Sequence, residues 1–344
     1  MIIETVQLNK VFKQAVKKPG LAGALKHLIT QEYVYKEAVK EVSLQIKEGE
    51  AVAYVGPNGA GKSTTIKMMT GILHPTSGQV KVCGIEPYKN RIENAKNIGV
   101  VFGQRTQLWW DIPISETYTL LRDIYELPQK QYQDQLDMLV TLLGMEEFLY
   151  LPARKLSLGQ RMRADLAASL IHKPSVLYLD EPTIGLDIVI KKKIRQFLKE
   201  LNQTSRTTIL LTTHDLEDIE DICERIIIID KGCLVYDGNL NTMKDTYAKE
   251  RVITIEAASP IADAALKLQG YPGIRYEYLD NRKQIKIYFN RFEIKAAELL
   301  NRFTSDYEVT DFKMDEPKIE TVIMKMYAGN LQTSAEDGEK YEKI

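Results

Sequence analysis

The residues best suited to chemistry lie in one glycine-rich stretch, between an apolar segment at 51–55 and a helical pattern at 65–70. The stretch matches G-x-x-x-x-G-K-[ST], in which small residues let backbone N–H groups turn toward phosphate oxygens and the following helix adds partial positive charge. In this pattern Lys62 reaches the β- and γ-phosphates, and the Ser63 hydroxyl can bind Mg²⁺. The sequence therefore predicts an ATP site formed by Gly56, Pro57, Asn58, Gly59, Ala60, Gly61, Lys62, Ser63 and Thr64.

A second group of candidate residues follows two apolar segments further along the chain. Asp180 and Glu181 follow the run at 176–179, and His214 follows the run at 207–211. Ligands of parallel α/β sheets collect at the carboxyl ends of the strands, so we expect these side chains near the phosphates. A carboxylate beside the γ-phosphate can accept a proton from the attacking water or orient that water, which makes Glu181 the candidate catalytic base.

Strand and helix patterns surround these residues. An apolar run at 97–102 predicts a strand before Gln104, and helical patterns occupy 115–125 and 129–143. A Ser-x-Gly turn then opens a helix over 160–171. Further strands are expected at 225–230 and 233–236.

The N-terminal part contains an apparent insertion. Residues 2–8 and 42–46 alternate like half-exposed strands, and between them 13–37 reads as an irregular basic insertion. Within it, apolar residues at helical spacing predict a short basic amphipathic helix, which either packs on its own domain or lies on lipid or a membrane partner. These residues are Leu21, Leu25, Leu28 and Ile29.

From Arg251 the rhythm of the chain changes. The order is strand 252–257, helix 261–268, strand 275–278, strand 284–289, helix 292–303, strand 307–312 and helix 318–327. This βαββαβ order predicts a small α+β domain of split-βαβ type over 250–330, followed by a polar, frayed tail at 331–344. The last helix has one apolar face, which we expect to pack on the domain's own sheet. That face consists of Ile319, Val322, Ile323 and Met326.

Composition limits the classes of protein that fit. The 344 residues leave room for two domains of about 150 residues. Lys and Arg number 46 against 47 Asp and Glu, so no nucleic-acid partner is expected from the charge. Three cysteines without metal-ligand spacing fit a reducing cytoplasm. No run approaches the 18 to 20 or so apolar residues that span a bilayer, so we expect any membrane role to come from partners.

Over about 1–240 the chain resembles the nucleotide-binding domain of an ATP-binding cassette (ABC) transporter. The resemblance rests on an ordered series of motifs: Walker A at 56–64, Q-loop Gln104, signature 156–160, Walker B 176–181, D-loop 185–187 and switch His214. It implies an α/β fold of the P-loop NTPase class, in which a mixed or parallel sheet core carries an antiparallel strand subdomain and a helical subdomain at about 105–160. The small split-βαβ domain would follow.

The resemblance also implies roles for single residues. Asp180 would hold Mg²⁺ through water, with Ser63 and Gln104 as further metal ligands. Glu181, His214, Lys62 and Gln104 would form the catalytic set, and His214 would sense the γ-phosphate. The signature would meet the ATP of the opposite subunit through Ser157, Leu158, Gly159 and Gln160, and Asp187 would run along the dimer seam. Because both half-sites look intact, a homodimer is the simplest assembly, and a heterodimer is the alternative.

The residue that stacks on adenine is left open between two aromatics. Phe12 stands where the family usually has its aromatic, whereas Tyr35 returns from the insertion just before the strand at 42–46. A stacked base is worth about 1 to 3 kcal/mol, so the choice affects affinity more than chemistry.

Partner surfaces and system type follow from the same resemblance. Trp109 and Trp110 lie where cassettes form a groove for a helix of the membrane-spanning permease, although core packing is the alternative. The phrase at 107–111 and the short tail domain are similar to bacterial drug- and polysaccharide-export cassettes with separate membrane subunits. The chain would then lie in the cytoplasm, peripheral on the inner face of the membrane.

We hypothesise that the 250–330 domain pairs with the same domain of a second copy and so tethers two cassettes. A soluble cassette acting on ribosomes or DNA and a non-hydrolysing regulatory cassette are the alternatives.

Overall fold

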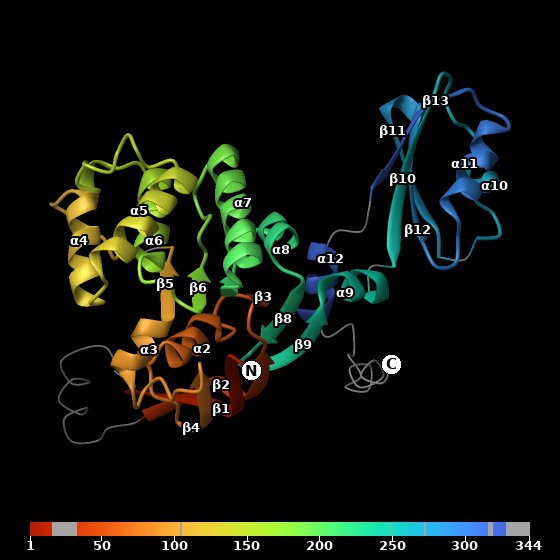
Figure 1. The fold of residues 1–344 in the computed structure, drawn as a ribbon. Coiled ribbons are helices and arrows are strands. Elements are labelled where there is room, and N and C mark those ends of the chain that lie inside the picture. Colours follow the sequence, from red (N-terminus) through yellow and green to blue (C-terminus); the bar gives the residue numbers. More distant parts are fainter. Residues whose placement is uncertain (16–32, 104, 248, 272, 316–318, 328–344) are drawn as a thin grey trace, which may run out of the picture. The chain divides into compact units, whose positions relative to one another are not determined.

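A computed structural model describes residues 1–15, 33–103, 105–247, 249–271, 273–315 and 319–327 (Figure 1). Its internal contacts divide the chain into two compact units, Met1–Gly238 and Asn239–Ile344. Within the described residues, no helix is both long and apolar enough to cross a membrane.

A six-stranded sheet forms the centre of the first unit. Neighbouring strands from β5 to β8 run parallel, and β9 lies at the edge beside β8. The inner strands are almost wholly apolar and buried, as expected where helices cover both faces of a parallel sheet. In spatial order the strands are β5 (Ile98–Phe102), β6 (Val176–Asp180), β7 (Thr208–Thr212), β3 (Ala51–Val55), β8 (Arg225–Asp230) and β9 (Cys233–Asn239).

An antiparallel sheet of three strands, in the order β2-β1-β4, lies on the other side of the helix that follows β3. Its strands are β1 (Ile3–Ala15), β2 (Tyr33–Ile46) and β4 (Ser77–Val82). Both β1 and β2 are longer than predicted, so the described ends of the 13–37 segment are paired strand and not irregular chain. Backbone pairing from Lys13↔Tyr35 to Ala15↔Tyr33 overrides the weak alternation there. The amphipathic helix predicted inside this segment lies outside the described residues.

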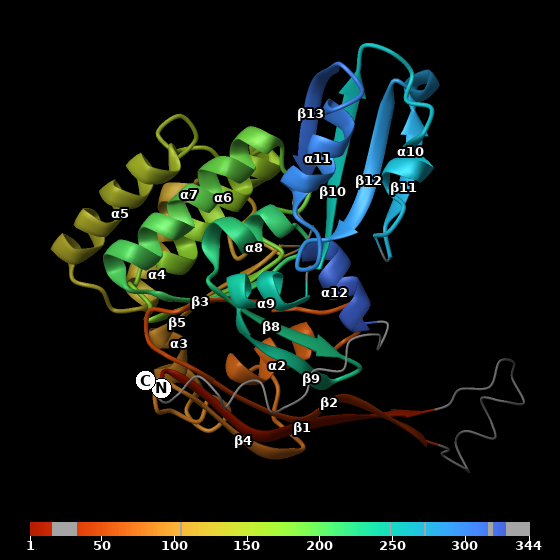
Figure 2. The same ribbon diagram turned by 90° about the vertical axis from the view of Figure 1, so that its right-hand side faces the viewer.

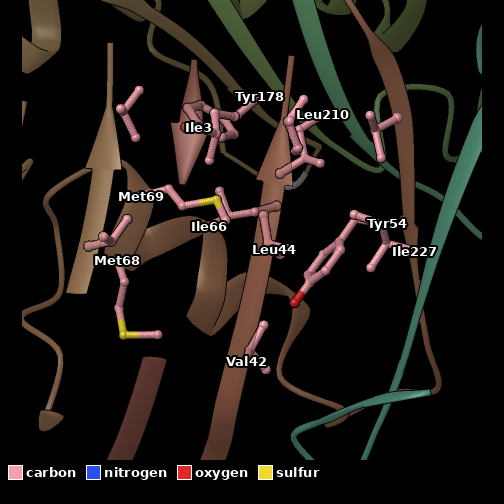
Figure 3. Close-up of a cluster of buried hydrophobic side chains, with 14 of the residues drawn as sticks. Ile3, Val42, Leu44, Tyr54, Ile66, Met68, Met69, Tyr178, Leu210 and Ile227 are labelled. Atoms are coloured by element: carbon pink, nitrogen blue, oxygen red, sulfur yellow. The ribbon is translucent and has the colours of Figure 1, made fainter. Parts of the chain in front are cut away.

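The helix α2 (Lys62–Met69) joins the two sheets through a shared core. Figure 3 shows Ile66, Met68 and Met69 of this helix among side chains from both sheets, including Leu44 from β2 and Tyr54 from β3. All five side chains are buried. Burying an aliphatic or aromatic side chain of this size contributes about 1.5 to 3 kcal/mol. The glycine-rich loop that precedes α2 is therefore anchored to a rigid helix.

The remaining helices of the first unit lie on both sides of the central sheet (Figures 1 and 2). They are α3 (Arg91–Asn97), α4 (Ile114–Ile124), α5 (Gln129–Leu143), the short 3₁₀ helix η1 (Ala153–Lys155), α6 (Leu158–Leu170), α7 (Ile188–Ser205) and α8 (Leu216–Ile222). The guanidinium of Arg163 donates to the carbonyls of Leu143 and Gly144, which fastens α6 to the carboxyl end of α5. Gly144 has φ 59°, the left-handed geometry of a helix C-cap.

The second unit contains a four-stranded antiparallel sheet in the order β11-β12-β10-β13. Its elements are α9 (Leu240–Tyr247), β10 (Glu250–Ala257), α10 (Ala264–Lys267), β11 (Arg275–Leu279), η2 (Asp280–Arg282), β12 (Gln284–Asn290), α11 (Ala296–Thr304), β13 (Val309–Asp315) and α12 (Ile319–Tyr327). The βαββαβ order is as predicted. Both α10 and α11 are shorter than predicted, and their first residues are Ala264 and Ala296. Before α10, the amide of Ile261 bonds the carbonyl of Arg282, so the chain is still held beside the β11–β12 connection there.

The expected packing of the last helix was wrong. Leu268, Leu299 and Phe303, which come from α10, α11 and their flanks, already fill the apolar face of the small sheet. The helix α12 contacts α9 instead. Its apolar residues, Ile319, Val322, Ile323 and Met326, are buried, but they do not belong to the described cluster on the small sheet.

Candidate functional site

The glycine-rich loop connects β3 to α2 in a conformation that depends on glycine. Gly59 and Gly61 have φ of 83° and 112°, where L side chains are disfavoured. A Cβ built on Gly61 would lie 2.4 Å from the Ala38 carbonyl oxygen, and one built on Gly56 would lie 2.4 Å from that of Ile229. The loop thus sits too close to β2 and β8 for any larger residue at these positions.

Lys62 begins α2 and is buried. Its ammonium group donates to the carbonyl of Gly56 and, at 3.2 Å, to that of Pro57. Burial lowers the pKa of Lys62, while the nearby carboxylates of Glu181 and Asp180 oppose this shift. The positive charge is therefore held over the loop by backbone oxygens and faces two acids.

Asp180 lies at the carboxyl end of β6, next to the start of α2. Its carboxylate accepts hydrogen bonds from the Ser63 hydroxyl at 3.2 Å and from the Thr212 hydroxyl at 2.5 Å. Sequence reasoning missed Thr212, although its place at the end of an adjacent apolar strand could have pointed to it. Among the described residues, no group of three or more His, Cys, Asp or Glu side chains could hold a metal. The hydroxyl and carboxylate oxygens of Ser63 and Asp180 nevertheless fit Mg²⁺, which prefers oxygen and takes few protein ligands beside phosphate.

Glu181 and His214 meet beside this cluster. The Nε2 atom of His214 lies 3.0 Å from Oε1 of Glu181. Glu181 has φ 58°, a left-handed conformation that costs a non-glycine residue of order 1 to 3 kcal/mol and is common at active sites. Its amide donates to the Thr212 carbonyl at 2.9 Å, which ties the end of β6 to the end of β7. The structure thus brings Lys62, Asp180 and Glu181 together, as their sequence positions predicted.

The signature residues lie at the amino end of α6. The Ser157 hydroxyl accepts from the Gln160 amide at 3.2 Å, and the Gln160 side chain accepts from the Ser157 amide at 2.9 Å, which forms a capping box. Asp187 is the N-cap of α7, and its side chain accepts from the Ile190 amide at 2.9 Å. A Cβ on Gly159 would meet Ile190 carbons at 3.4 Å, so the starts of α6 and α7 touch. The apolar side chains around them that are exposed are Leu158, Ile184, Ile188 and Val189.

Gln104 lies outside the described residues, but the segment after it is anchored. The Thr106 hydroxyl and the Gln107 amide both donate to Oδ1 of Asp165 on α6 at 3.0 Å. Asp165 is buried, and this burial raises its pKa to about 6, although the two hydrogen bonds and Arg161 oppose the shift. Sequence reasoning did not single out Asp165.

The two candidate base-stacking aromatics point from opposite faces of the β1–β2 ribbon. Phe12 pairs with Lys36, and Lys13 pairs with Tyr35. Because successive residues of a strand face opposite sides, only one of the two rings can face the glycine-rich loop. Phe12 is half-buried, whereas Tyr35 is 64% exposed.

Trp109 and Trp110 are 42% and 48% exposed, so neither is a core residue. The guanidinium of Arg161 lies 4.7 Å from the ring centre of Trp110, a cation–π contact that holds the ring at the surface. Tyr150, also exposed, belongs to a neighbouring segment, because residues 113 and 152 form a bridge between the two stretches.

The glycine-rich loop, the two acids at the end of β6 with His214 beyond β7, and the parallel sheet define a P-loop ATPase of the cassette type. The family model described as ABC transporter matches residues 39–184. The ABC transporter ATP-binding protein NatA of Bacillus subtilis (strain 168) is 32% identical over 214 residues, which are 62% of this chain and 87% of that protein. The linearmycin resistance ATP-binding protein LnrL of the same organism is 31% identical over 227 residues, 66% of this chain and 72% of that protein.

A solved structure agrees with these relatives. The ATP-binding cassette MJ0796, in a dimeric post-hydrolysis state bound to ADP and Pi, superposes with a TM-score of 0.57 at 27% identity, covering 69% of this chain and 98% of that one. The chain belongs to the ATP-binding proteins of the ABC transporter family and is an ATPase. The predicted fold class is confirmed.

Proposed function

We propose that this chain is the ATP-hydrolysing subunit of an ABC exporter whose membrane-spanning subunits are separate chains. The observation that carries the hydrolytic part is the contact between His214 and Glu181 at 3.0 Å, beside Asp180 and the loop of Lys62. A non-hydrolysing cassette would not need a carboxylate and an imidazole held together at the end of the loop.

In the proposed reaction, water attacks the γ-phosphorus of ATP and the bond to the bridging oxygen of ADP breaks. Glu181 orients this water and accepts its proton, and His214 holds the carboxylate in place and contacts the γ-phosphate. Lys62 neutralises charge on the β- and γ-phosphates. Ser63 and Asp180 would hold Mg²⁺, which supplies positive charge to the phosphates when bound.

The site is proposed to be completed by a second cassette. At the start of α6 Ser157 is exposed and Gly159 is half-buried. This start suits a phosphate, because the first turn of a helix presents N–H groups beyond those that the capping box uses. The exposed apolar residues around it, Ile188 among them, need cover that a partner cassette provides. Asp187, at the start of α7, would then lie in the seam. We propose a homodimer, since this chain supplies both halves of the site.

Adenine is proposed to stack on Phe12. Its half-buried ring is already held by its neighbours, so it loses less side-chain freedom on stacking than the exposed ring of Tyr35 on the opposite face of the ribbon. Tyr35 is the alternative if adenine meets the opposite face of the β1–β2 ribbon.

The permease is proposed to dock at Trp109 and Trp110. Two half-exposed indoles, one braced by Arg161, form the rigid aromatic anchors that interfaces favour. The similarity to the linearmycin resistance protein supports export, and the second unit is proposed as an accessory domain that pairs with its twin. The chain would work at the cytoplasmic face of the membrane.

The experiment is purification of the tagged chain from detergent-solubilised membranes of its source. We expect a polytopic membrane protein to copurify, and we expect the Trp109→Ser/Trp110→Ser double variant to lose it while hydrolysing ATP. Ile72→Ser, which alters a similarly exposed apolar residue, is the control. Copurification of ribosomes or DNA in place of a membrane protein would contradict the proposal.

A further inference from the structure

One buried carboxylate that the catalytic account does not use connects the loops that carry Glu181 and His214. Asp218 lies on α8 and is fully buried. Its Oδ2 accepts from the hydroxyl of Thr183 and, at 3.0 Å, from that of Thr213. Its Oδ1 accepts from Nε of Arg195, on α7, at 2.6 Å. A buried carboxylate with three charge-assisted bonds is held in a single position.

The two threonines stand directly beside the proposed catalytic pair. Thr183 follows Glu181 by two residues, and Thr213 immediately precedes His214. The Thr213 hydroxyl also accepts from the amide of Asp215, the residue after His214. Asp218 therefore binds the loop after β6 at Thr183, two residues beyond Glu181. It binds the loop after β7 at Thr213, whose hydroxyl in turn bonds the amide that follows His214.

The charge of Asp218 is balanced in the same cluster. Arg195 is buried and also pairs with Glu217 at 2.6 Å and Asp215 at 3.3 Å. Lys191, one turn earlier on α7, pairs with Asp215 at 2.6 Å. Desolvating a carboxylate is tolerated only with such partners, so the pair with Arg195 allows Asp218 to sit between the loops.

We propose that Asp218, anchored by Arg195, is a positioning residue that sets the distance and orientation between Glu181 and His214. The inference rests on the proposed roles of those two residues. In this role Asp218 acts through the hydroxyls of Thr183 and Thr213, which donate to its carboxylate. A misplacement of about 1 Å at a reacting group can cost about 100-fold in rate, so loosening either loop lowers turnover without removing a catalytic group.

The test uses threonine-to-valine changes, because Val keeps the shape of Thr while removing the hydroxyl. Thr213→Val and Thr183→Val are each expected to lower kcat about tenfold and to leave KM for ATP within about twofold, a loss of transition-state alignment and not of binding. Thr213→Ser restores the donor and should restore kcat. Thr204→Val is the control, since the Thr204 hydroxyl donates to the Glu200 carbonyl within α7.

Double variants separate positioning from folding. In a Glu181→Gln background, Thr183→Val should cause no further loss of the residual turnover, because the carboxylate that Thr183 positions is already gone. Multiplying losses would overturn the inference, as would parent-like kcat in Thr213→Val or failure of Thr213→Ser to rescue. If Glu181→Gln itself keeps parent turnover, the proposed catalytic base is wrong, a result distinct from the failure of Asp218.

Discussion

Replacing Asp165 by Asn should change the pH dependence of stability in a defined direction. The pKa of Asp165 is raised from its usual 3.8 to about 6, chiefly by burial. Between these values the folded state holds a proton that the unfolded state has released, so Asp165 makes the parent less stable as pH rises from about 4 to 6. Asn cannot ionise, yet its oxygen can still accept from Thr106 and Gln107.

The magnitude follows from the size of the shift. Each pKa unit corresponds to about 1.4 kcal/mol, so a shift of about two units corresponds to about 3 kcal/mol. Asp165→Asn should unfold with nearly the parent's free energy at pH 4 and become more stable than the parent by up to about 3 kcal/mol at pH 7.

Intrinsic fluorescence during urea unfolding measures this difference in the free energy of unfolding for the first unit of the chain, Met1–Gly238. The only two tryptophans, Trp109 and Trp110, belong to the unit that contains Asp165. Asp134→Asn, the same substitution at an exposed position on α5, is the control. A difference between Asp165→Asn and the parent that stays constant from pH 4 to 7 would refute the reasoning.

Three further predictions concern the site and the assembly. Phe12→Ala should weaken ATP binding by about 1 to 3 kcal/mol in calorimetric titration while Tyr35→Ala changes it little, and the reverse order would assign the stack to Tyr35. A Ser157→Ala chain mixed with a Lys62→Ala chain should regain part of the ATPase activity that each lacks alone, because one site is rebuilt from two intact halves; demonstrated mixed dimers without recovery would count against a shared site. Truncation after Leu240 should weaken nucleotide-free dimerisation in light scattering, and an unchanged dimer would exclude the tethering role of the second unit.

The elements predicted most accurately from the sequence are those whose ends are marked by proline or glycine. Helix α5 begins after Pro128 and ends at Gly144, and both its bounds were predicted correctly. Helix α2 starts three residues earlier than predicted, because its first turn is formed by Lys62, Ser63 and Thr64, which show no apolar period.

What the sequence could not supply was contact between distant segments. The apolar spacing of α12 identified a face that is buried, but not α9 as its partner. Asp218 and Thr183 stand 35 residues apart, and no local pattern links them. Motif order predicted that Glu181 and His214 belong to one site, whereas the buried carboxylate behind them became visible only in the fold.

The measurement that tests the central claim most directly is ATP turnover and ATP binding by Glu181→Gln in the presence of Mg²⁺. The account predicts that kcat falls by about 10² to 10⁴-fold, the usual contribution of a general base, while the dissociation constant for ATP stays near the parent value. Glu147→Gln, at an exposed position in the same unit, should behave like the parent. Unchanged turnover in Glu181→Gln would contradict the assignment of the catalytic carboxylate.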